Sequence, residues 1–410
     1  MKNYIQLFVV AAFSLTVFNS WIFTSVIASG DFWYFFPSML HNLSLCPQAW
    51  YGVVGNGLGG SGIVYQNPVM VFALTLKIVT ILGLNWPFVA KMLLYIPFII
   101  MCIFSSVFLI RKVLPGNNLW LFAPIIFLFN TYSLMLVGGG QILLALSYSL
   151  MPFVVYLFMQ SINSSKKRLF LYSATGLVLG LQTLLDLRIA FITFISAPVY
   201  FIVLNLSDSK PKFLPERFLG LVIPLMIAGL IHAFWIFPTL VYGMDPIKVL
   251  GVDYSGLGIV NFLSFARLEN SISLLHPYWP ENIFGKVYFM KPEFLVLPIL
   301  AFVSLLFLKK EEKKTKTIIL FFATFSSVGV FLAKGSSEPF GNIYVWLFSH
   351  VPGFQLFRDS FKWYISISLS YSILITYSLN KISDVLKNRF NINHSKVLVF
   401  TFFLIYFSFL

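Results

Sequence analysis

A few charged residues lie beside aromatic or glycine-rich stretches, and these residues could do chemistry. Asp31 belongs to the segment 30–34, Gly-Asp-Phe-Trp-Tyr, which directly follows a long apolar run. A carboxyl group with aromatic neighbours in a low-dielectric setting has a raised pKa, which suits a general base or a metal ligand. The simpler alternative is that Asp31 caps a helix that begins at Phe32.

The segment 352–363, Pro-Gly-Phe-Gln-Leu-Phe-Arg-Asp-Ser-Phe-Lys-Trp, provides a second candidate. Arg358 and Lys362 are four residues apart, so at the start of a helix both would project over one face, with Asp359 beside them. Two cations and the free N–H groups of a helix start form an anion-binding site. The alternative is that both side chains reach lipid headgroups and anchor the helix.

Asp186 and Arg188 form a third candidate, because they stand two residues apart where two apolar runs meet. Ionisable residues in such a place are costly unless they form pairs or line a cavity. The pair is therefore either a structural salt bridge or part of a polar site in which Arg188 provides a second cation.

Two loops add weaker candidates. The segment 47–68 contains Trp50 and Asn56 in a glycine-rich context, whose exposed N–H groups could cradle a phosphate or a sugar, although such loops are often only flexible turns. His276 and Tyr278 belong to His-Pro-Tyr-Trp-Pro. Aromatic side chains of this kind suit either stacking on a sugar ring or a belt at the membrane interface.

The composition indicates which elements must position these residues. The 410 residues are 59% hydrophobic and 10% charged, with a mean hydropathy of +0.87, whereas soluble domains carry roughly 25% charged residues. The apolar runs approach the length that crosses a bilayer as a helix, and the alternation typical of a β-barrel is absent. We expect spans near 4–28, 67–84, 87–110, 118–136, 141–160, 169–185, 189–205, 217–242, 292–308, 315–334 and 360–380.

The sequence therefore predicts an all-α, polytopic integral membrane protein with about 11–12 transmembrane helices and one transmembrane domain over 1–410. The polar segments 29–66, 243–291 and 335–359 are the expected outer loops, with short interfacial helices in them. The last apolar stretch, 396–410, stops at the end of the sequence, which suggests the N-terminal part of a longer protein.

The net charge of +14 lies mostly in short loops between the apolar runs. Such clusters are typical of cytoplasmic loops, so the charge indicates a multi-pass protein of the plasma membrane and no nucleic-acid partner. The candidate residues then fall on the extracytoplasmic face. One conflict remains, since full crossings at both 67–84 and 87–110 would leave Arg111 and Lys112 on that outer face, and either a re-entrant segment or a misassigned span would remove it.

The order of these features resembles the GT-C class of membrane glycosyltransferases, and within it the membrane domain of the arabinofuranosyltransferase-like group. The resemblance rests on the Gly-Asp with aromatics at 30–34, the Pro-x-x-Trp and glycine-rich loop ending in Asn67-Pro68, and Phe-Arg-x-x-x-Lys at 357–362. It extends over nearly the whole chain, but each motif is short.

The resemblance implies an enzyme that moves a sugar from a polyprenyl-phosphate donor to a hydroxyl of a glycan or glycolipid acceptor, with inversion. By this resemblance Asp31 is the general base, and Arg358 and Lys362, joined by Arg188, bind the donor phosphate. Asp186, Trp50, Asn56, His276, Tyr278 and Asp359 are supporting or acceptor residues. Asp31 stands without the second acid of many GT-C members, so no cofactor is assigned and a divalent cation stays open.

Two other functions fit the composition. A transporter or flippase of lipid-linked saccharides also needs cations at an outer cavity, but it should carry ionisable residues near the bilayer midplane. Apart from Lys77, Lys91 and His232, the charges of this chain lie at the ends of the expected helices. The third function is a non-catalytic membrane component of an envelope-assembly complex.

Overall fold

The fold is known from a computed structural model. The structure describes residues 2–23, 30, 75, 77–79, 81–163, 168–207, 215–242, 256–277, 295–351, 353–390 and 401–402. Every regular element with bounds in these ranges is a helix. The prediction of an all-α fold is confirmed for this part of the chain.

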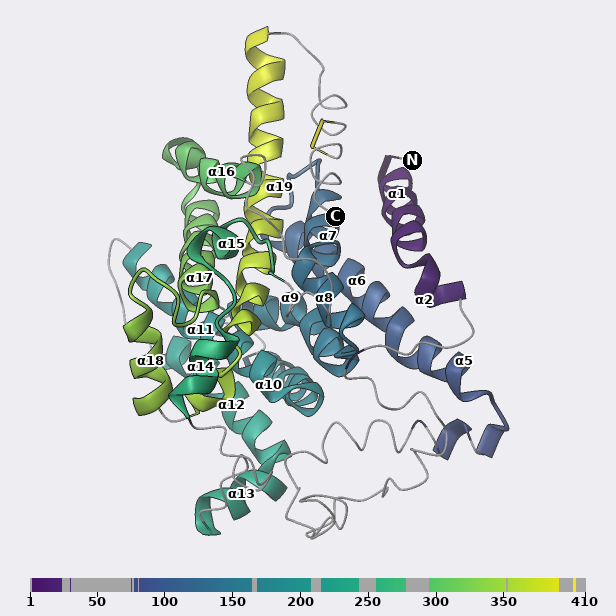
Figure 1. Cartoon of the computed structure of the whole chain (residues 1–410). Coiled ribbons are helices and arrows are strands. Elements are labelled where there is room, and N and C mark those ends of the chain that lie inside the picture. The colour runs from purple at the N-terminus through teal and green to yellow at the C-terminus, as the bar shows by residue number, and fades with distance from the viewer. Residues whose placement is uncertain are drawn as a thin grey trace.

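The helices follow one another along the chain and pack into one bundle (Figure 1). Their bounds are α1 (Lys2–Val17), α2 (Asn19–Phe23), α5 (Trp86–Ala90), η1 (Lys91–Tyr95), α6 (Ile96–Val113), α7 (Phe122–Leu128), α8 (Thr131–Gly138), α9 (Ile142–Asn163), α10 (Arg168–Leu185), α11 (Leu187–Ser207), α12 (Pro215–Ile231), α13 (Ala233–Tyr242), α14 (Leu257–Leu263), α15 (Leu268–Ile272), α16 (Val296–Val303), η4 (Ser304–Lys310), α17 (Lys313–Ala333), α18 (Gly341–His350), η5 (Phe354–Phe357), η6 (Ser360–Trp363) and α19 (Tyr364–Phe390).

Five of the described stretches are long and apolar enough to cross a membrane. They are Trp86–Val113, Ile142–Asn163, Arg168–Leu185, Leu187–Ser207 and Lys313–Ala333. An α-helix of about 20 residues spans the hydrocarbon core, so these helices identify a membrane-embedded protein. Two other expected spans differ in form, because the regions 118–136 and 217–242 are each divided between two shorter helices, whereas most of the expected span 360–380 lies in the single helix α19.

The break between α7 and α8 occurs at Asn130, which is buried in the bundle. The Asn130 Oδ1 accepts from the Ser133 N–H at 3.0 Å, as an N-cap does, and its amide donates to the carbonyls of Ile126 and Phe127. Tyr148 of α9 also donates to the Phe127 carbonyl. The carbonyls released by the break are thus bonded to side chains, which makes it tolerable inside an apolar bundle.

Helix α19 forms the centre of the bundle, although its hydropathy is modest. Its side chains from Tyr364 to Leu379 are buried, including five serines and a threonine. Several of these hydroxyls donate to carbonyls of the preceding turn, as Ser366 and Ser372 do at 2.7 and 2.6 Å. Hydroxyls satisfied in this way can be buried, and their small size lets α17 and α7 pack closely on the helix.

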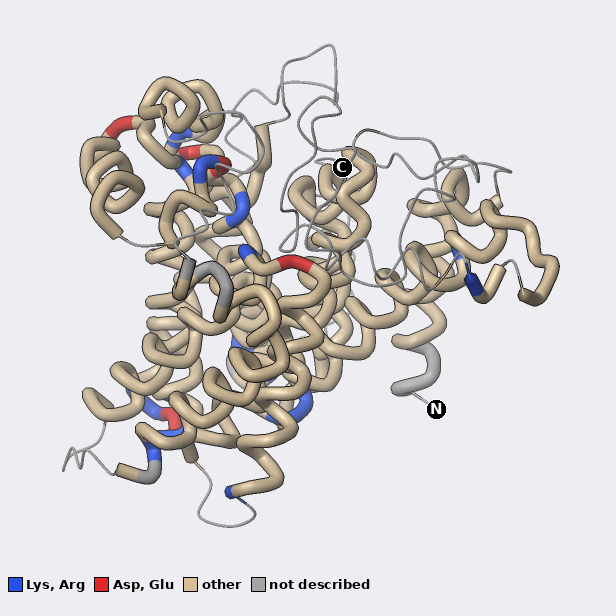
Figure 2. The backbone as a smooth tube through the Cα atoms, turned by 90° about the horizontal axis from the view of Figure 1, so that it is seen from below, with Lys and Arg blue, Asp and Glu red and all other residues tan. Residues whose placement is uncertain are grey.

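Loops rich in Lys and Arg gather at one end of the bundle, which we call the basic end. The Asn118 N–H donates to the Asn380 side chain at 3.1 Å, and Gln6 donates to the Asn118 carbonyl at 3.3 Å. Lys381 forms an ion pair with Glu311. The loop after α6, the loop before α17 and the last turns of α19 therefore meet. Figure 2 shows the charged residues confined to a few places, with long uncharged stretches between them.

The opposite end, called the site end, carries the other set of connections. The Ser360 hydroxyl donates to the Ala333 carbonyl at 2.9 Å, which joins the end of α17 to the segment before α19. Gly30 lies here too, because a Cβ on it would be 2.0 Å from the carbonyl oxygen of Gly139. Gly30 has a φ of +45° and so combines a left-handed conformation with a close backbone approach.

These ends resolve the conflict over Arg111 and Lys112. Helix α6 ends at Val113 beside the basic end, and the stretch Trp86–Val113 runs antiparallel to α1 and α2, since the Lys91 ammonium donates to the Ile22 carbonyl at 3.3 Å. Gly30 and Trp86 consequently lie toward the same end of the bundle. The positions of Arg111 and Lys112 then agree with the other basic loops.

Candidate anion site

Two ionised side chains lie at the junction of α10 and α11. Asp186 is the single residue between these helices, and its Oδ1 accepts from the N–H groups of Arg188 and Ile189 at 2.9 and 3.1 Å, so it caps α11. The Arg188 guanidinium donates to the same carboxylate, with Nη2 2.6 Å from Oδ2 and Nε 3.2 Å from both oxygens. The cap thereby fixes a cation at the site end.

The second pair of charges comes from the segment between α18 and α19. This segment is not the start of an α-helix as expected, but two 3₁₀ helices, η5 and η6. Lys362 folds back three residues, and its ammonium lies 2.6 Å from Oδ2 of Asp359. The Lys362 side chain is only 1% exposed, so it does not anchor a helix in the headgroups, whereas Arg358 is 32% exposed and its Nε lies 3.9 Å from Asp359 Oδ1.

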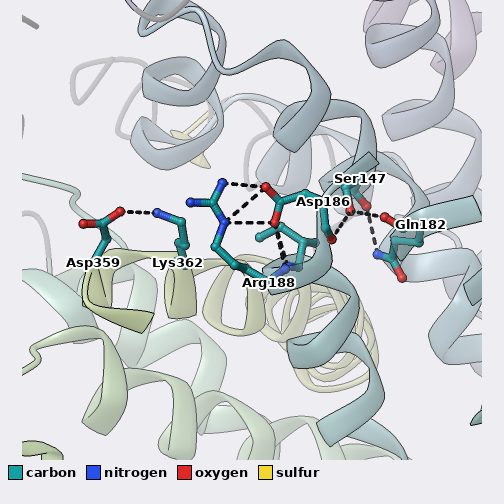
Figure 3. A network of polar contacts seen from close by, with 7 residues as sticks. Ser147, Gln182, Asp186, Arg188, Asp359 and Lys362 are labelled. Carbon is teal, nitrogen blue, oxygen red and sulfur yellow. Dashed lines mark hydrogen bonds and ion pairs between the residues drawn. The ribbon is translucent and has the colours of Figure 1, made fainter. Parts of the chain in front are cut away.

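The two pairs form one row across the bundle. Figure 3 shows Asp359, Lys362, Arg188 and Asp186 in this order, with the two cations in the middle and the carboxylates at the ends. The two cations are close enough that the positive charge of Arg188, added to burial, lowers the pKa of Lys362. Within the described residues, Arg358 joins the row through Asp359, so three cationic side chains contact its two carboxylates.

Burial changes the pKa values of the ionisable groups in the row. Burial, reinforced by Arg188, lowers the pKa of Lys362 to about 8, although Asp359 acts in the opposite direction. Burial acts to raise the pKa of Asp359, but the charge and hydrogen bond of Lys362, together with the charges of Arg188 and Arg358, lower it overall. At neutral pH both members of this pair are therefore charged, while Lys362 holds its proton less firmly than an exposed lysine does.

The two arginines of the row remain partly accessible, whereas Lys362 is buried beside them. Arg188 is 34% exposed, and it uses Nε and Nη2 for Asp186, so within the described residues Nη1 makes no hydrogen bond. The arrangement is the structural salt bridge that the sequence allowed, and it also leaves donors on the open side of the row. An anion placed there would contact the Arg188 guanidinium, with the buried positive charge of Lys362 beside it.

A buried aromatic cluster lies against the row. Tyr132 of α8 lies close enough to the row to interact electrostatically with Asp186, Arg188 and Asp359. Its ring stacks on Tyr364 with a centroid distance of 5.9 Å. The Tyr132 hydroxyl is buried and has no hydrogen-bond partner among the described residues.

His276 belongs to the same cluster, with its ring edge-on to Phe361 at 5.1 Å. Burial and then the Lys362 charge lower the pKa of His276 to about 3, so the ring is neutral at physiological pH. The structure therefore places His276 in the wall of the site rather than on an exposed surface.

Two polar residues support the Asp186 end of the row. Gln182, one turn before Asp186, donates from Nε2 to the Ser147 carbonyl and to Thr193 Oγ1, at 2.9 Å each. Ser147 donates in return to the Gln182 carbonyl at 3.2 Å. These bonds join α9, α10 and α11 where the cap is formed, and Figure 3 shows those between Gln182 and Ser147 to the right of Asp186.

The predicted site residues divide into two groups. Arg188, Lys362, Arg358, Asp186 and Asp359 come together, although 170 residues or more separate the two pairs in the sequence, and His276 lies beside them. Asp31, Trp50, Asn56 and Tyr278 are outside the described residues. Gly30, which precedes Asp31, is described and contacts Gly139 directly after α8, the helix that carries Tyr132.

Sequence reasoning missed Tyr132, Gln182 and Ser147. Each lies in an apolar run, where a tyrosine, a glutamine or a serine gives no signal beyond its own polarity. Gln182 was the most detectable of the three, because it stands four residues before Asp186 and so falls on the same helical face.

The structure offers limited support for a metal site. Within the described ranges, no three His, Cys, Asp or Glu side chains are close enough to hold an ion together. Asp186 and Asp359 each bind a cationic side chain already. The divalent cation left open by the sequence is therefore not assigned to these two residues.

Known proteins do not add to this geometry, since no family model, no curated protein and no solved structure matches the chain.

Proposed function

We propose that the protein is a membrane glycosyltransferase of GT-C type, which moves a sugar from a polyprenyl-phosphate donor to an acceptor hydroxyl. The observation that carries the proposal is the row in which Lys362 and Arg188 lie side by side between two carboxylates. In this proposal the row binds the donor phosphate.

The charge of the row suits a phosphate leaving group. When the bond between the sugar and the phosphate breaks, negative charge grows on the phosphate oxygens. Cations that are already fixed stabilise such charge without reorganisation. Asp186 and Asp359 hold the cations in place, and Arg188 and Arg358 keep part of their surface exposed.

The location suits a substrate carried on a lipid. The row lies near the ends of α10, α11 and α17, three of the helices that are long enough to cross a membrane. It is at the opposite end from the basic loops, and the positive-inside rule therefore favours the extracytoplasmic side for it. A lipid-linked phosphate in that leaflet would lie at the level of helix ends.

The acceptor side of the reaction needs a base, because the attacking hydroxyl must lose its proton. Gly30 packs on Gly139, at the end of the short helix that begins beside the row. This contact places Gly30, the residue before Asp31, at the site end. We assign the base to Asp31, in accord with the resemblance to GT-C enzymes, and a positioned base contributes roughly 10²–10⁴-fold to the rate.

A transporter is the competing proposal, and the break between α7 and α8 bears on it. Transporters often bind ions at broken helices through unbonded backbone carbonyls. Here the carbonyls of Ile126, Phe127 and Leu128 accept bonds from Asn130, Tyr148 and Ser133. Because side chains occupy these carbonyls, the break has no evident vacancy for an ion.

The test measures transfer by purified protein in proteoliposomes. Polyprenyl phosphates carrying radiolabelled pentoses or hexoses are supplied with a membrane glycolipid extract as acceptor, and label in a new glycosidic bond is counted. Lys362→Met and Asp31→Asn should each reduce transfer by at least about a hundredfold. Lys387→Met is the matched control, since Lys387 is an exposed lysine near the other end of α19.

Three results would contradict the proposal. Equal transfer by wild type and Asp31→Asn would contradict the assignment of the base to Asp31. Equal transfer by Lys362→Met and Lys387→Met would contradict the assignment of the phosphate site to the row. Movement of the labelled lipid across the bilayer, with no new glycosidic bond for any sugar tested, would favour the transporter.

A further inference from the structure

Helix α18 exposes a face that differs from the lipid-facing surfaces of the long helices. Phe340 just before it is 65% exposed, and Ile343 and Trp346 in it are 44% and 55% exposed. Asn342, Ser349 and His350 are exposed beside them. Trp346 stands near the middle of this mixed face, and the His350 ring stacks on it at 5.1 Å.

The composition of this face fits the boundary between headgroups and acyl chains. The exposed side chains of α10 are different, since they include Leu169, Phe170, Leu177 and Leu181 and match the hydrocarbon core. Tryptophan beside polar groups is typical of the interface, where one part of the ring is wet and the other apolar. Helix α18 itself contains no acidic residue, and the exposed Glu338 just before it accepts from the Phe340 N–H at 3.1 Å.

The position of α18 agrees with its composition. It begins at Gly341, a few residues after α17 ends at Ala333, and α17 is one of the helices long enough to cross a membrane. Ten residues of α-helix extend only about 15 Å, too short to cross the bilayer. The helix is thus kept near the membrane surface at the site end.

The other face of α18 is clamped to the segment that carries the cations. Tyr344 is fully buried, its hydroxyl donates to the Phe357 carbonyl, and its ring packs edge-on against Phe354 at 5.3 Å. Phe357 directly precedes Arg358 in the chain. A shift of α18 would therefore be passed through Tyr344 to the Arg358–Lys362 segment.

We propose that the Phe340, Ile343 and Trp346 face of α18 sits in the headgroup–acyl boundary of the leaflet at the site end, and that Tyr344 thereby holds Arg358–Lys362 at the depth of the lipid phosphates. The occupant of the face is the bilayer itself. The first half of this statement is independent of the proposed glycosyl transfer, and only the second half rests on it.

The depth of Trp346 tests the first half. Purified protein is reconstituted into bilayers whose lipids carry bromine either near the headgroup or near the end of the acyl chain. The fluorescence of Trp346 is obtained by subtracting the spectrum of the Trp346→Phe variant from that of the wild type. Shallow bromine should quench this component more strongly than deep bromine or aqueous acrylamide. Quenching by acrylamide alone would overturn the proposal and indicate water or a protein partner on this face.

A second measurement tests the clamp. Tyr344→Phe removes only the hydroxyl that bonds Phe357, so Trp346 should keep its depth while affinity for polyprenyl phosphate in bilayers falls several-fold. Unchanged affinity would overturn the clamp. If wild type itself binds no polyprenyl phosphate, the proposed function fails, whereas the fluorescence result still decides the placement of α18.

Discussion

Removal of the Lys362 ammonium should leave Asp359 as a buried charge without its main partner. The Lys362 side chain is almost fully buried and bonds Oδ2 of Asp359, while Oδ1 has no hydrogen-bond partner among the described residues. Arg358 is the nearest remaining cation, at 3.9 Å and partly exposed. Loss of one member of a buried pair costs about 3–5 kcal/mol, so we expect Lys362→Met to lower the free energy of unfolding by about that amount.

A double variant distinguishes the loss of the Lys362–Asp359 ion pair from general destabilisation of the fold. Asp359→Asn in the Lys362→Met background removes the orphaned charge, so the double variant should be about 2–3 kcal/mol more stable than the sum of the two single effects. The assay is reversible unfolding in mixed micelles, followed by the loss of helical signal. Additive effects would refute the reasoning, because they would mean that the two side chains do not depend on each other in the folded protein.

Further predictions concern pH, the helix break and the junction of α10 and α11. The pKa of Lys362 is lowered to about 8, so its positive charge is present below that pH and lost above it; affinity for polyprenyl phosphate should fall as the pH rises through about 8, and Lys362→Arg should flatten this profile. Asn130→Ala removes a cap and the donor to two carbonyls, and should cost about 2–4 kcal/mol in the same unfolding assay, with a cost below 1 kcal/mol counting against the role of the cap. Asp186→Asn keeps the shape of the cap but frees the Arg188 guanidinium, so it should alter phosphate affinity more than stability, and an effect on stability alone would assign the pair a purely structural role.

The sequence predicted the elements better than their interruptions. Composition and apolar run length gave the all-helical membrane fold, because no soluble fold accommodates so much apolar surface. The break at Asn130 was not visible, since it depends on Tyr148 of the next helix bonding the released carbonyl. Such a long-range partner leaves no mark in the local pattern.

The candidate site was predicted in part. Arg188 and Lys362 were identified because charges in apolar surroundings are rare and need partners. Their meeting could not be derived, since it depends on how α11 packs beside α17 and α19. The expected geometry of the 352–363 segment was wrong, because Lys362 turns back to Asp359 through a 3₁₀ helix instead of joining Arg358 on one helical face.

In the proposed site, Lys362 and Arg188 act together on one lipid phosphate. Titration of bilayer-embedded protein with polyprenyl phosphate, and with the uncharged polyprenol as reference, tests this claim most directly. Wild type should prefer the phosphate strongly, Arg188→Ala and Lys362→Met should each lose most of that preference, and the double variant should lose little more than either. Equal affinity of wild type for the phosphate and the alcohol would contradict the account.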